Sequence, residues 1–450
     1  MNTAFRKIVA ASLYVGLLAG SPALAQTEQA LRPDLPRILP ERERADLKEA
    51  WLKERLDTLV PKLMREQKVD MWVLVAREYA EDPVLLTMLD GTTFNARRRT
   101  ILVFWDPGDG RPVERLVISK HGMTDFQKSW DMAKQPDQWK RFAEVVHERK
   151  PHKIALNTSP ESAFSDGLTH SQYTALVAAL TPEERTKIVS SYPLATAWLE
   201  TRLPSEMQRY PEILRAAHAI IAEGFSDKVV KPGVTTPLDL EWWFRQRTTD
   251  LGLTNWSQPT VRIFRKGAPG SSIRDANTVI QKGDMLHVDL CLLYLNLRTD
   301  MQHVAYVLRD GETDAPAGLK AGLLAANGVQ DAITSEFHTG VSGNEILARA
   351  RAKATAAGLA PWIYSHPIGF YGHSAGSAIG LSEEQKFVPQ GEYRLRPDIM
   401  WSIESRASKA VPEWDNLVVN FETEEDAFFD GQAVSFPDGR QTKFHLIKSE

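Results

Sequence analysis

Two aspartates in neighbouring apolar segments constrain the fold of this chain more than any other feature. Asp289 lies in GDMLHVDLCLLY and Asp300 in LRTDMQHVAYVL, and both segments are predicted to be strands. A hairpin with its turn centred on Tyr294 and Leu295 would place the two carboxylates directly opposite each other. Cross-strand neighbours lie about 4.5–5.5 Å apart, and like charges there destabilise a sheet. Such a buried pair persists if one carboxyl is protonated or if a cation bridges both. We pursue the second hypothesis, with two divalent ions.

Three residues further along the chain have side chains that could complete such a site. His366 lies in SHPIGFYGHSAG, and Glu404 and Glu422 end the otherwise apolar segments 399–404 and 417–422, both predicted strands. Acidic residues are rarely buried without partners. Taken singly, each has an ordinary explanation, since His366 could be structural and Glu422 lies in an acidic, solvated run. Together, four carboxylates and one imidazole suit Mn²⁺, Co²⁺, Fe²⁺ or Zn²⁺, and the excess of carboxylates favours Mn²⁺.

Composition excludes several classes of protein. The 450 residues are 43% hydrophobic, which is enough for two domains with cores of their own. A formal net charge of −4 provides no basic field for nucleic acid or for an anionic membrane. The single cysteine, Cys291, excludes an intramolecular disulfide. Cys291 shares a strand face with Asp289 and could touch the site, although a buried inert thiol is the more ordinary interpretation.

The N-terminus is typical of a secretory signal peptide. Arg6 and Lys7 precede an apolar stretch, and an Ala-x-Ala pattern predicts cleavage after Ala25. Since the apolar stretch is too short for a comfortable membrane span, we expect a soluble protein in the periplasm or outside the cell. An uncleaved membrane anchor is the alternative.

The rest of the chain divides into an arm and two α/β parts. Residues 26–41 are polar and proline-rich, and residues 42–200 alternate predicted helices and strands. In residues 201–450, helical patterns near 211–225, 236–252, 319–337 and 344–357 are combined with predicted strands at 284–294, 299–308, 398–405 and 416–423. The expected fold class is therefore α/β (α+β), with a domain boundary near Thr201.

The second part resembles the pita-bread metallopeptidases, which include methionine aminopeptidase, X-Pro aminopeptidase, prolidase and the metal-free relative creatinase. The resemblance is carried by GDMLHVDL, RTDMQH, HPIG, IMWSIE and NFETEED–FFDG, which have the order of the family's Asp, Asp, His, Glu and Glu ligands. It implies a creatinase/prolidase-type N-terminal domain followed by a pita-bread catalytic domain. The implied metal ligands are listed in order as Asp289, Asp300, His366, Glu404 and Glu422.

The match to the family pattern is incomplete around the substrate. His373 lies in GHSAG, which also resembles the family's GHGIG string, so either histidine could be the ligand; HxIGxxxH favours His366 as ligand and His373 as substrate contact. Residues 262–274 lack the family's usual additional histidine but carry Arg265 and Lys266. An asparagine and a phenylalanine precede Glu422, where the family has RIE.

The resemblance implies a dinuclear aminopeptidase that hydrolyses short peptides, with proline as the second residue. Two divalent ions would supply an activated water. Glu404 would serve as general base, and His373 would donate a hydrogen bond to the developing oxyanion. The alternatives are an X-Pro dipeptidase, a metal-free creatinase-like C–N hydrolase and a noncatalytic binding module. A homodimer is expected only by analogy with the family.

Overall fold

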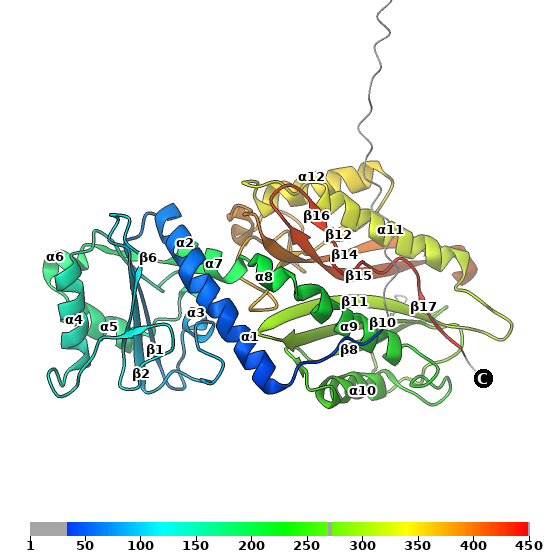
Figure 1. Ribbon diagram of the computed structural model, residues 1–450. Helices are drawn as coiled ribbons and strands as arrows, with labels where there is room; N and C mark the ends of the chain where they lie inside the picture. Colours follow the sequence, from blue (N-terminus) through cyan, green and yellow to red (C-terminus); the bar gives the residue numbers. More distant parts are fainter. Residues whose placement is uncertain (1–33, 269–271, 449–450) are drawn as a thin grey trace, which may run out of the picture. The chain divides into compact units, whose positions relative to one another are not determined.

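The computed structural model describes residues 34–268 and 272–448 (Figure 1). The predicted signal peptide, residues 1–25, and residues 26–33 of the predicted arm lie outside these ranges. None of the helices in the described ranges combines the length and apolar character that crossing a bilayer requires.

The N-terminal α/β domain is built on a six-stranded mixed sheet in the order β4-β3-β2-β1-β5-β6. Its strands are β1 (Met71–Arg77), β2 (Arg99–Trp105), β3 (Glu114–Ile118), β4 (Gln127–Lys128), β5 (Ile154–Leu156) and β6 (Ile188–Ser190). Strand β1 is central because its side chains are apolar on both faces: Trp72 and Leu74 pack into one core cluster, and Val73 and Val75 pack into another.

Helices cover both faces of this sheet. One face packs against α1 (Glu41–Glu54), the π-helical turn Arg55–Leu59, α2 (Val60–Glu66), α3 (Pro83–Leu86) and α7 (Tyr192–Glu200). The other packs against α4 (Gln138–Arg149) and α5 (His170–Ala179), with the short α6 (Pro182–Arg185) nearby (Figure 1). The π-helical turn joins α1 and α2 without a break.

The C-terminal part contains an 11-stranded sheet whose main path is β12-β14-β15-β11-β10-β8-β9. The strands on this path are β8 (Thr260–Phe264), β9 (Ser272–Ile273), β10 (Met285–Tyr294), β11 (Leu297–Val307), β12 (Pro361–Ile363), β14 (Ile399–Val411) and β15 (Leu417–Phe429). Four short strands pair with it at the side: β7 (Thr254–Asn255), β13 (His366–Ile368), β16 (Val434–Ser435) and β17 (His445–Ile447).

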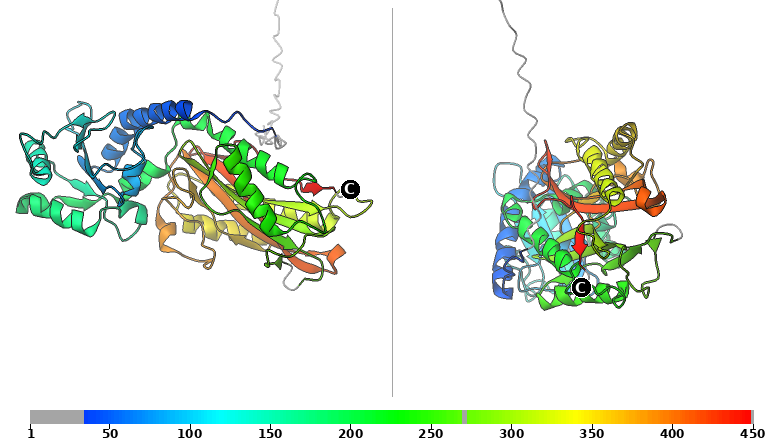
Figure 2. Two further views of the ribbon diagram at one scale, coloured as in Figure 1. Left: turned by 90° about the horizontal axis from the view of Figure 1, so that it is seen from below. Right: turned by 90° about the vertical axis from the view of Figure 1, so that its right-hand side faces the viewer.

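Two pairs of helices flank this sheet and follow the short α8 (Pro204–Met207) in the chain. Helices α9 (Tyr210–Gly224) and α10 (Pro237–Asp250) pack against β8, β10 and β11, whereas α11 (Ala317–Thr334) and α12 (Gly343–Ala356) share a core cluster with β14 and β15. Figure 2 shows the yellow helices α11 and α12 separated from the green helices α9 and α10 by the strands. Thr236 caps α10, as its start signal predicts, and Ser342 caps α12.

The hairpin of β10 and β11 has a different register from the predicted one. Leu295 and Asn296 form its two-residue turn, with φ angles of 56° and 63°. Cys291 therefore lies opposite Asp300, and Asp289 lies opposite Gln302. The prediction that the two aspartates are directly opposed is wrong because the turn lies one residue later, where Asn296 tolerates a positive φ. The two carboxylates are diagonal neighbours on one face.

Candidate metal centre

Acidic side chains and one imidazole meet on the face of the C-terminal sheet that α11 and α12 do not cover. The carboxylates of Asp289 on β10 and Asp300 on β11 approach within 4.8 Å of each other. Ligand atoms of Asp300 and of His366 on β13 also lie within 4.8 Å of each other. The same limit holds among the ligand atoms of His366, Glu404 of β14 and Glu424 of β15. Of the five side chains proposed from the sequence, the structure thus brings four together.

Glu422 is the predicted ligand that lies apart from this cluster. Its cross-strand neighbour is Arg406, and its carboxylate accepts a short hydrogen bond from the guanidinium of Arg262. Burial would raise the pKa of Glu422, but His287 and Arg262 lower it below its usual value. Because the carboxylate already has the guanidinium groups of Arg262 and Arg406 as cationic partners, it is not positioned as Glu424 is for sharing a metal ion.

Glu424 lies two residues further along the same strand face, at the centre of the cluster. It is directly opposite Glu404, 1% of its surface is exposed, and it accepts a 2.6 Å hydrogen bond from the side-chain amide of Gln302. Period-2 alternation places positions 422 and 424 on one face, so the sequence alone could not choose between them. The pairing of β15 with β14 makes that choice.

Gln302 is a second residue of the site that the sequence analysis missed. Its amide nitrogen donates to Glu404 at 3.1 Å as well as to Glu424, and its amide oxygen accepts from His287 Nε2 at 2.9 Å. The signal was available, because position 302 follows Asp300 on the same strand face. Its neutral amide carries no charge that would mark it as part of an ionic site.

His366 presents an imidazole nitrogen suited to a metal ion. Its Nδ1 donates to the carbonyl of Pro367 at 3.0 Å, which leaves the lone pair on Nε2. Within the described residues, Nε2 has no hydrogen-bond partner, although it is buried 3.9 Å from Asp300 and 3.8 Å from Glu424. Burial, reinforced by His373, lowers the pKa of His366 to about 3, so the ring stays neutral.

His373 lies at the edge of the site. Its ring is exposed and packs against His366 with ring centroids 4.9 Å apart and against Trp256 at 5.4 Å. His366 therefore occupies the buried position and His373 the accessible one. The roles of ligand for His366 and substrate contact for His373 stay predictions.

The carboxyl groups of the cluster bind protons tightly when no cation is present. Burial raises the pKa of Asp289 to about 6 and that of Glu404 to about 8. Burial, reinforced by neighbouring carboxylates, raises the pKa values of Asp300 and Glu424 well above the usual range. A divalent cation reverses this balance, since it favours the ionised form of each group. Together with the unpaired Nε2 of His366, these groups fit a carboxylate-rich site for divalent ions.

A small cavity of about 250 Å³ lies beside the cluster and is lined by one of its members, His366. His366, His373 and Tyr364 line it from the C-terminal sheet, and Glu161 and Phe164 line it from the N-terminal domain. Tyr371 fixes the two sides together by donating a 2.7 Å hydrogen bond to the carbonyl of Pro83. The volume lies below the roughly 300–1,000 Å³ of drug-sized pockets.

The basic residues noted near the missing family histidine are engaged elsewhere. Arg265 forms a 2.7 Å ion pair with the buried Asp284, and Lys266 pairs with Asp415 at 3.2 Å. Neither side chain is therefore positioned as a replacement for that histidine.

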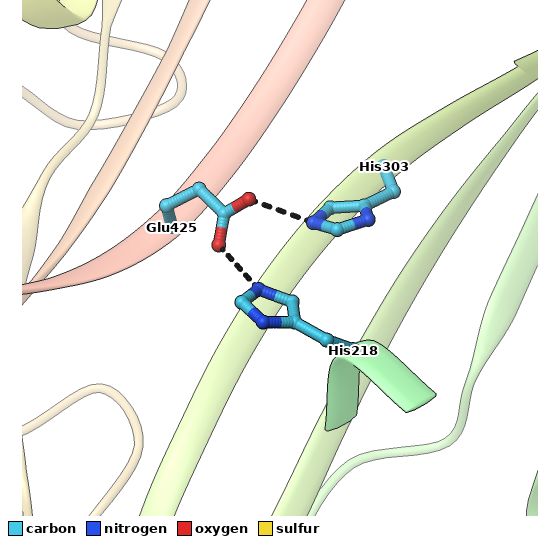
Figure 3. Close-up of side chains that lie close together, drawn as sticks. All are labelled: His218, His303 and Glu425. Carbon is cyan, nitrogen blue, oxygen red and sulfur yellow. Dashed lines mark hydrogen bonds and ion pairs between the residues drawn. The ribbon is translucent and has the colours of Figure 1, made fainter. Parts of the chain in front are cut away.

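A second buried cluster lies behind the ligand-bearing strands (Figure 3). Glu425 accepts hydrogen bonds from His303 at 2.7 Å and from His218 of α9 at 3.1 Å, and the other nitrogen of His218 contacts Asp438 at 3.0 Å. Burial would lower the pKa of His218, but Glu425 and Asp438 raise it to about 9. Both ring nitrogens of His218 are at hydrogen-bond distance from a carboxylate, so the cluster is a hydrogen-bonded clamp between α9, β11 and β15.

Comparison with known proteins agrees with this geometry. Residues 212–429 match the model of metallopeptidase family M24. The fold is similar to that of an X-Pro aminopeptidase from Thermotoga maritima MSB8, with 15% identity, a TM-score of 0.60, and coverage of 86% of this chain and 99% of that one. The resemblance to the pita-bread metallopeptidases, with an additional N-terminal domain, is thereby confirmed.

Two further solved structures show the same two-part fold. An Xaa-Pro dipeptidase from Bacillus anthracis is 16% identical, with a TM-score of 0.57 and coverage of 91% of this chain and 100% of that one. The His350Ala form of Escherichia coli aminopeptidase P is 12% identical, with a TM-score of 0.54 and coverage of 90% and 97%. Among curated proteins there is no significant sequence match.

Proposed function

We propose that this protein is a dinuclear metallopeptidase that removes the first residue from short peptides, with proline as the second residue. The observation that carries the proposal is the buried cluster of acidic side chains around His366, whose Nε2 has no hydrogen-bond partner among the described residues and which lines a cavity of about 250 Å³. The ligands are listed in order as Asp289, Asp300, His366, Glu404 and Glu424, with Glu424 in place of Glu422.

Each residue of the site has a specific task in amide hydrolysis. When bound, two divalent ions would supply an activated water and polarise the scissile carbonyl. Glu404 takes the proton released during attack and delivers it to the leaving nitrogen. His373, exposed beside His366, donates a hydrogen bond to the carbonyl oxygen as charge develops there.

The cavity supports cleavage at a chain end. Its small volume and the wall formed by Phe164 and Glu161 leave room for a short peptide terminus. The preference for proline is drawn from the X-Pro aminopeptidase and Xaa-Pro dipeptidase of similar fold. Action on dipeptides alone, as an X-Pro dipeptidase, is the second candidate.

A matched pair of variants tests the proposal. Glu424→Gln removes a proposed ligand and Glu422→Gln removes a neighbouring carboxylate of the same strand face, so both lose one charge at nearly the same place. Metal content and hydrolysis of X-Pro dipeptides and tripeptides are measured for each. Losing a ligand should lower metal affinity by more than the ~10–100-fold that is typical of losing a residue that only supports a ligand.

The outcomes separate the candidate functions. We expect Glu424→Gln to lose metal and activity while Glu422→Gln retains bound metal. Cleavage of dipeptides only would favour the dipeptidase, activity unaffected by a chelator would favour a metal-free hydrolase, and metal binding without hydrolysis of any peptide would favour a binding module. Activity unaffected by a chelator, or metal binding without peptide hydrolysis, would each reject the proposed metallopeptidase.

Export and assembly are separate proposals. We infer from the pattern of residues 1–25 that the chain is exported and cleaved after Ala25. N-terminal sequencing of protein recovered from the periplasm and the medium tests this. The expected homodimer is tested by sedimentation of the purified protein.

A further inference from the structure

The only cysteine of the chain lies inside the proposed metal centre. Cys291 is 4% exposed, and the register of β10 and β11 places it directly opposite Asp300. Its Sγ is 3.1 Å from Asp300 Oδ1 and 3.4 Å from Asp289 Oδ1, so the thiol contacts both aspartates. The predicted register would have placed Asp289 opposite Asp300, with Cys291 two pairs away, opposite Arg298.

The separations suit three donors around one cation. Sulfur and oxygen donors bind divalent ions at about 2.3 Å and about 2.1 Å, so two of them on one ion lie ~3.1 Å apart at 90° and ~3.6 Å apart at the tetrahedral angle. Both Sγ–oxygen distances, 3.1 and 3.4 Å, fall in this range. A metal ion held by the two carboxylates would therefore be within reach of the sulfur.

A second feature, independent of the thiol, points to a cation beside Asp300. Nε2 of His366 is buried without a hydrogen-bond partner in the described ranges and faces the other oxygen of Asp300, Oδ2, at 3.9 Å. Asp300 thus has a thiol at one oxygen and a bare imidazole nitrogen at the other. An unpaired buried nitrogen is costly unless a ligand completes it.

We propose that Cys291 is an additional metal ligand, which binds as a thiolate beside Asp289 and Asp300. The proposal rests on the proposed metallopeptidase function and extends its ligand set. Binding forms a metal–sulfur bond and breaks the S–H bond, and the proton leaves to solvent.

A thiolate ligand changes which metal the site prefers. Thiolate sulfur selects Zn²⁺ and similar softer ions, whereas all-carboxylate sites suit Mn²⁺. The preference for Mn²⁺ expected from counting carboxylates is therefore replaced by a preference for Zn²⁺ or Co²⁺.

Cobalt spectroscopy tests the ligand directly. The full-length protein is freed of metal with a chelator and titrated with Co²⁺, and the thiolate-to-cobalt charge-transfer absorption in the near ultraviolet is recorded. Because the chain has 1 Cys, any such band reports on Cys291 alone. Cys291→Ser is the matched control, and Asp300→Asn controls for binding at this site. Competition of Zn²⁺ with Mn²⁺ is measured on the same proteins.

We expect the band in the unmodified protein and its loss in Cys291→Ser, which still binds Co²⁺ and whose preference for Zn²⁺ over Mn²⁺ falls about tenfold or more. Stoichiometric Co²⁺ binding and X-Pro hydrolysis without the band would overturn the thiolate ligand and leave the proposed function intact. If the unmodified protein bound no Co²⁺ and hydrolysed no peptide, both proposals would be wrong.

Discussion

Glu200, at the end of α7, provides a measurable test of how burial controls ionisation beside the cavity. It is 1% exposed, accepts a 2.8 Å hydrogen bond from the hydroxyl of Tyr393, and lies 3.7 Å from Arg396. Burial raises its pKa to about 8, although Tyr393 and Arg396 act in the opposite direction. Its carboxyl group is therefore largely protonated in the folded protein at neutral pH.

The magnitude follows from the difference between the folded and unfolded pKa values. The folded value is about 8 and the ordinary value is 4.5, and each unit corresponds to ~1.4 kcal/mol. Because the folded state binds the proton more tightly, its stability is fully present below pH 4.5 and is lost as the pH rises through 8. The free energy of unfolding should fall by up to ~5 kcal/mol over this range on account of this group.

Glu200→Gln keeps the shape of the side chain and an acceptor for Tyr393 but cannot ionise. The free energy of unfolding of the variant and of the unmodified protein is measured by urea titration at pH 5 and at pH 9. We expect the difference, variant minus unmodified protein, to be several kcal/mol larger at pH 9 than at pH 5. Glu66→Gln is the control, because Glu66 is exposed and its ion pair with the half-buried Arg396 should contribute ~1 kcal/mol or less. Parallel pH dependences for Glu200→Gln and the unmodified protein would refute the reasoning.

Three further substitutions have expected outcomes. Glu206→Gln leaves the buried guanidinium of Arg55, now 3.0 Å from Glu206, without its counter-charge, so the free energy of unfolding should fall by ~3–5 kcal/mol in urea titrations. Gly372→Ala would place a Cβ 2.3 Å from the ring of Trp256, so the ring must shift and unfolding should become ~1–3 kcal/mol easier; an unchanged urea midpoint would contradict the close contact. His373→Ala should keep the metal content but lower kcat ~100-fold for an X-Pro peptide, and an unchanged kcat would remove the residue from the mechanism.

Local patterns predicted the elements that carry the site better than the site itself. The apolar segments around Asp289 and Asp300 are strands joined by a two-residue turn, as expected, but the turn position depended on which residue could adopt a positive φ. Asn296 is the better candidate for that conformation, and a two-residue turn that includes Asn296 has the observed register. The diagonal arrangement of the aspartates then follows directly.

The choice between neighbouring residues required the pairing of distant strands. Glu422 and Glu424 share a face of β15, and only the contact of Glu424 with Glu404 and Gln302 distinguishes them. The clamp of His218 on Glu425 joins parts of the chain that no periodicity relates. Alternation specifies faces, whereas register and tertiary packing specify partners.

Phe164 of the N-terminal domain forms part of the cavity wall. Metal binding and the limit on peptide length would therefore depend on different domains. The groups that would hold the ions lie on strands of the C-terminal sheet, while Phe164 and Glu161, which would limit peptide length in the proposed peptidase, belong to the other domain. Substitutions of these two residues could thus lengthen or shorten the accepted peptide without altering a single ligand. This separation allows the range of accepted peptides to change while the metal chemistry stays the same.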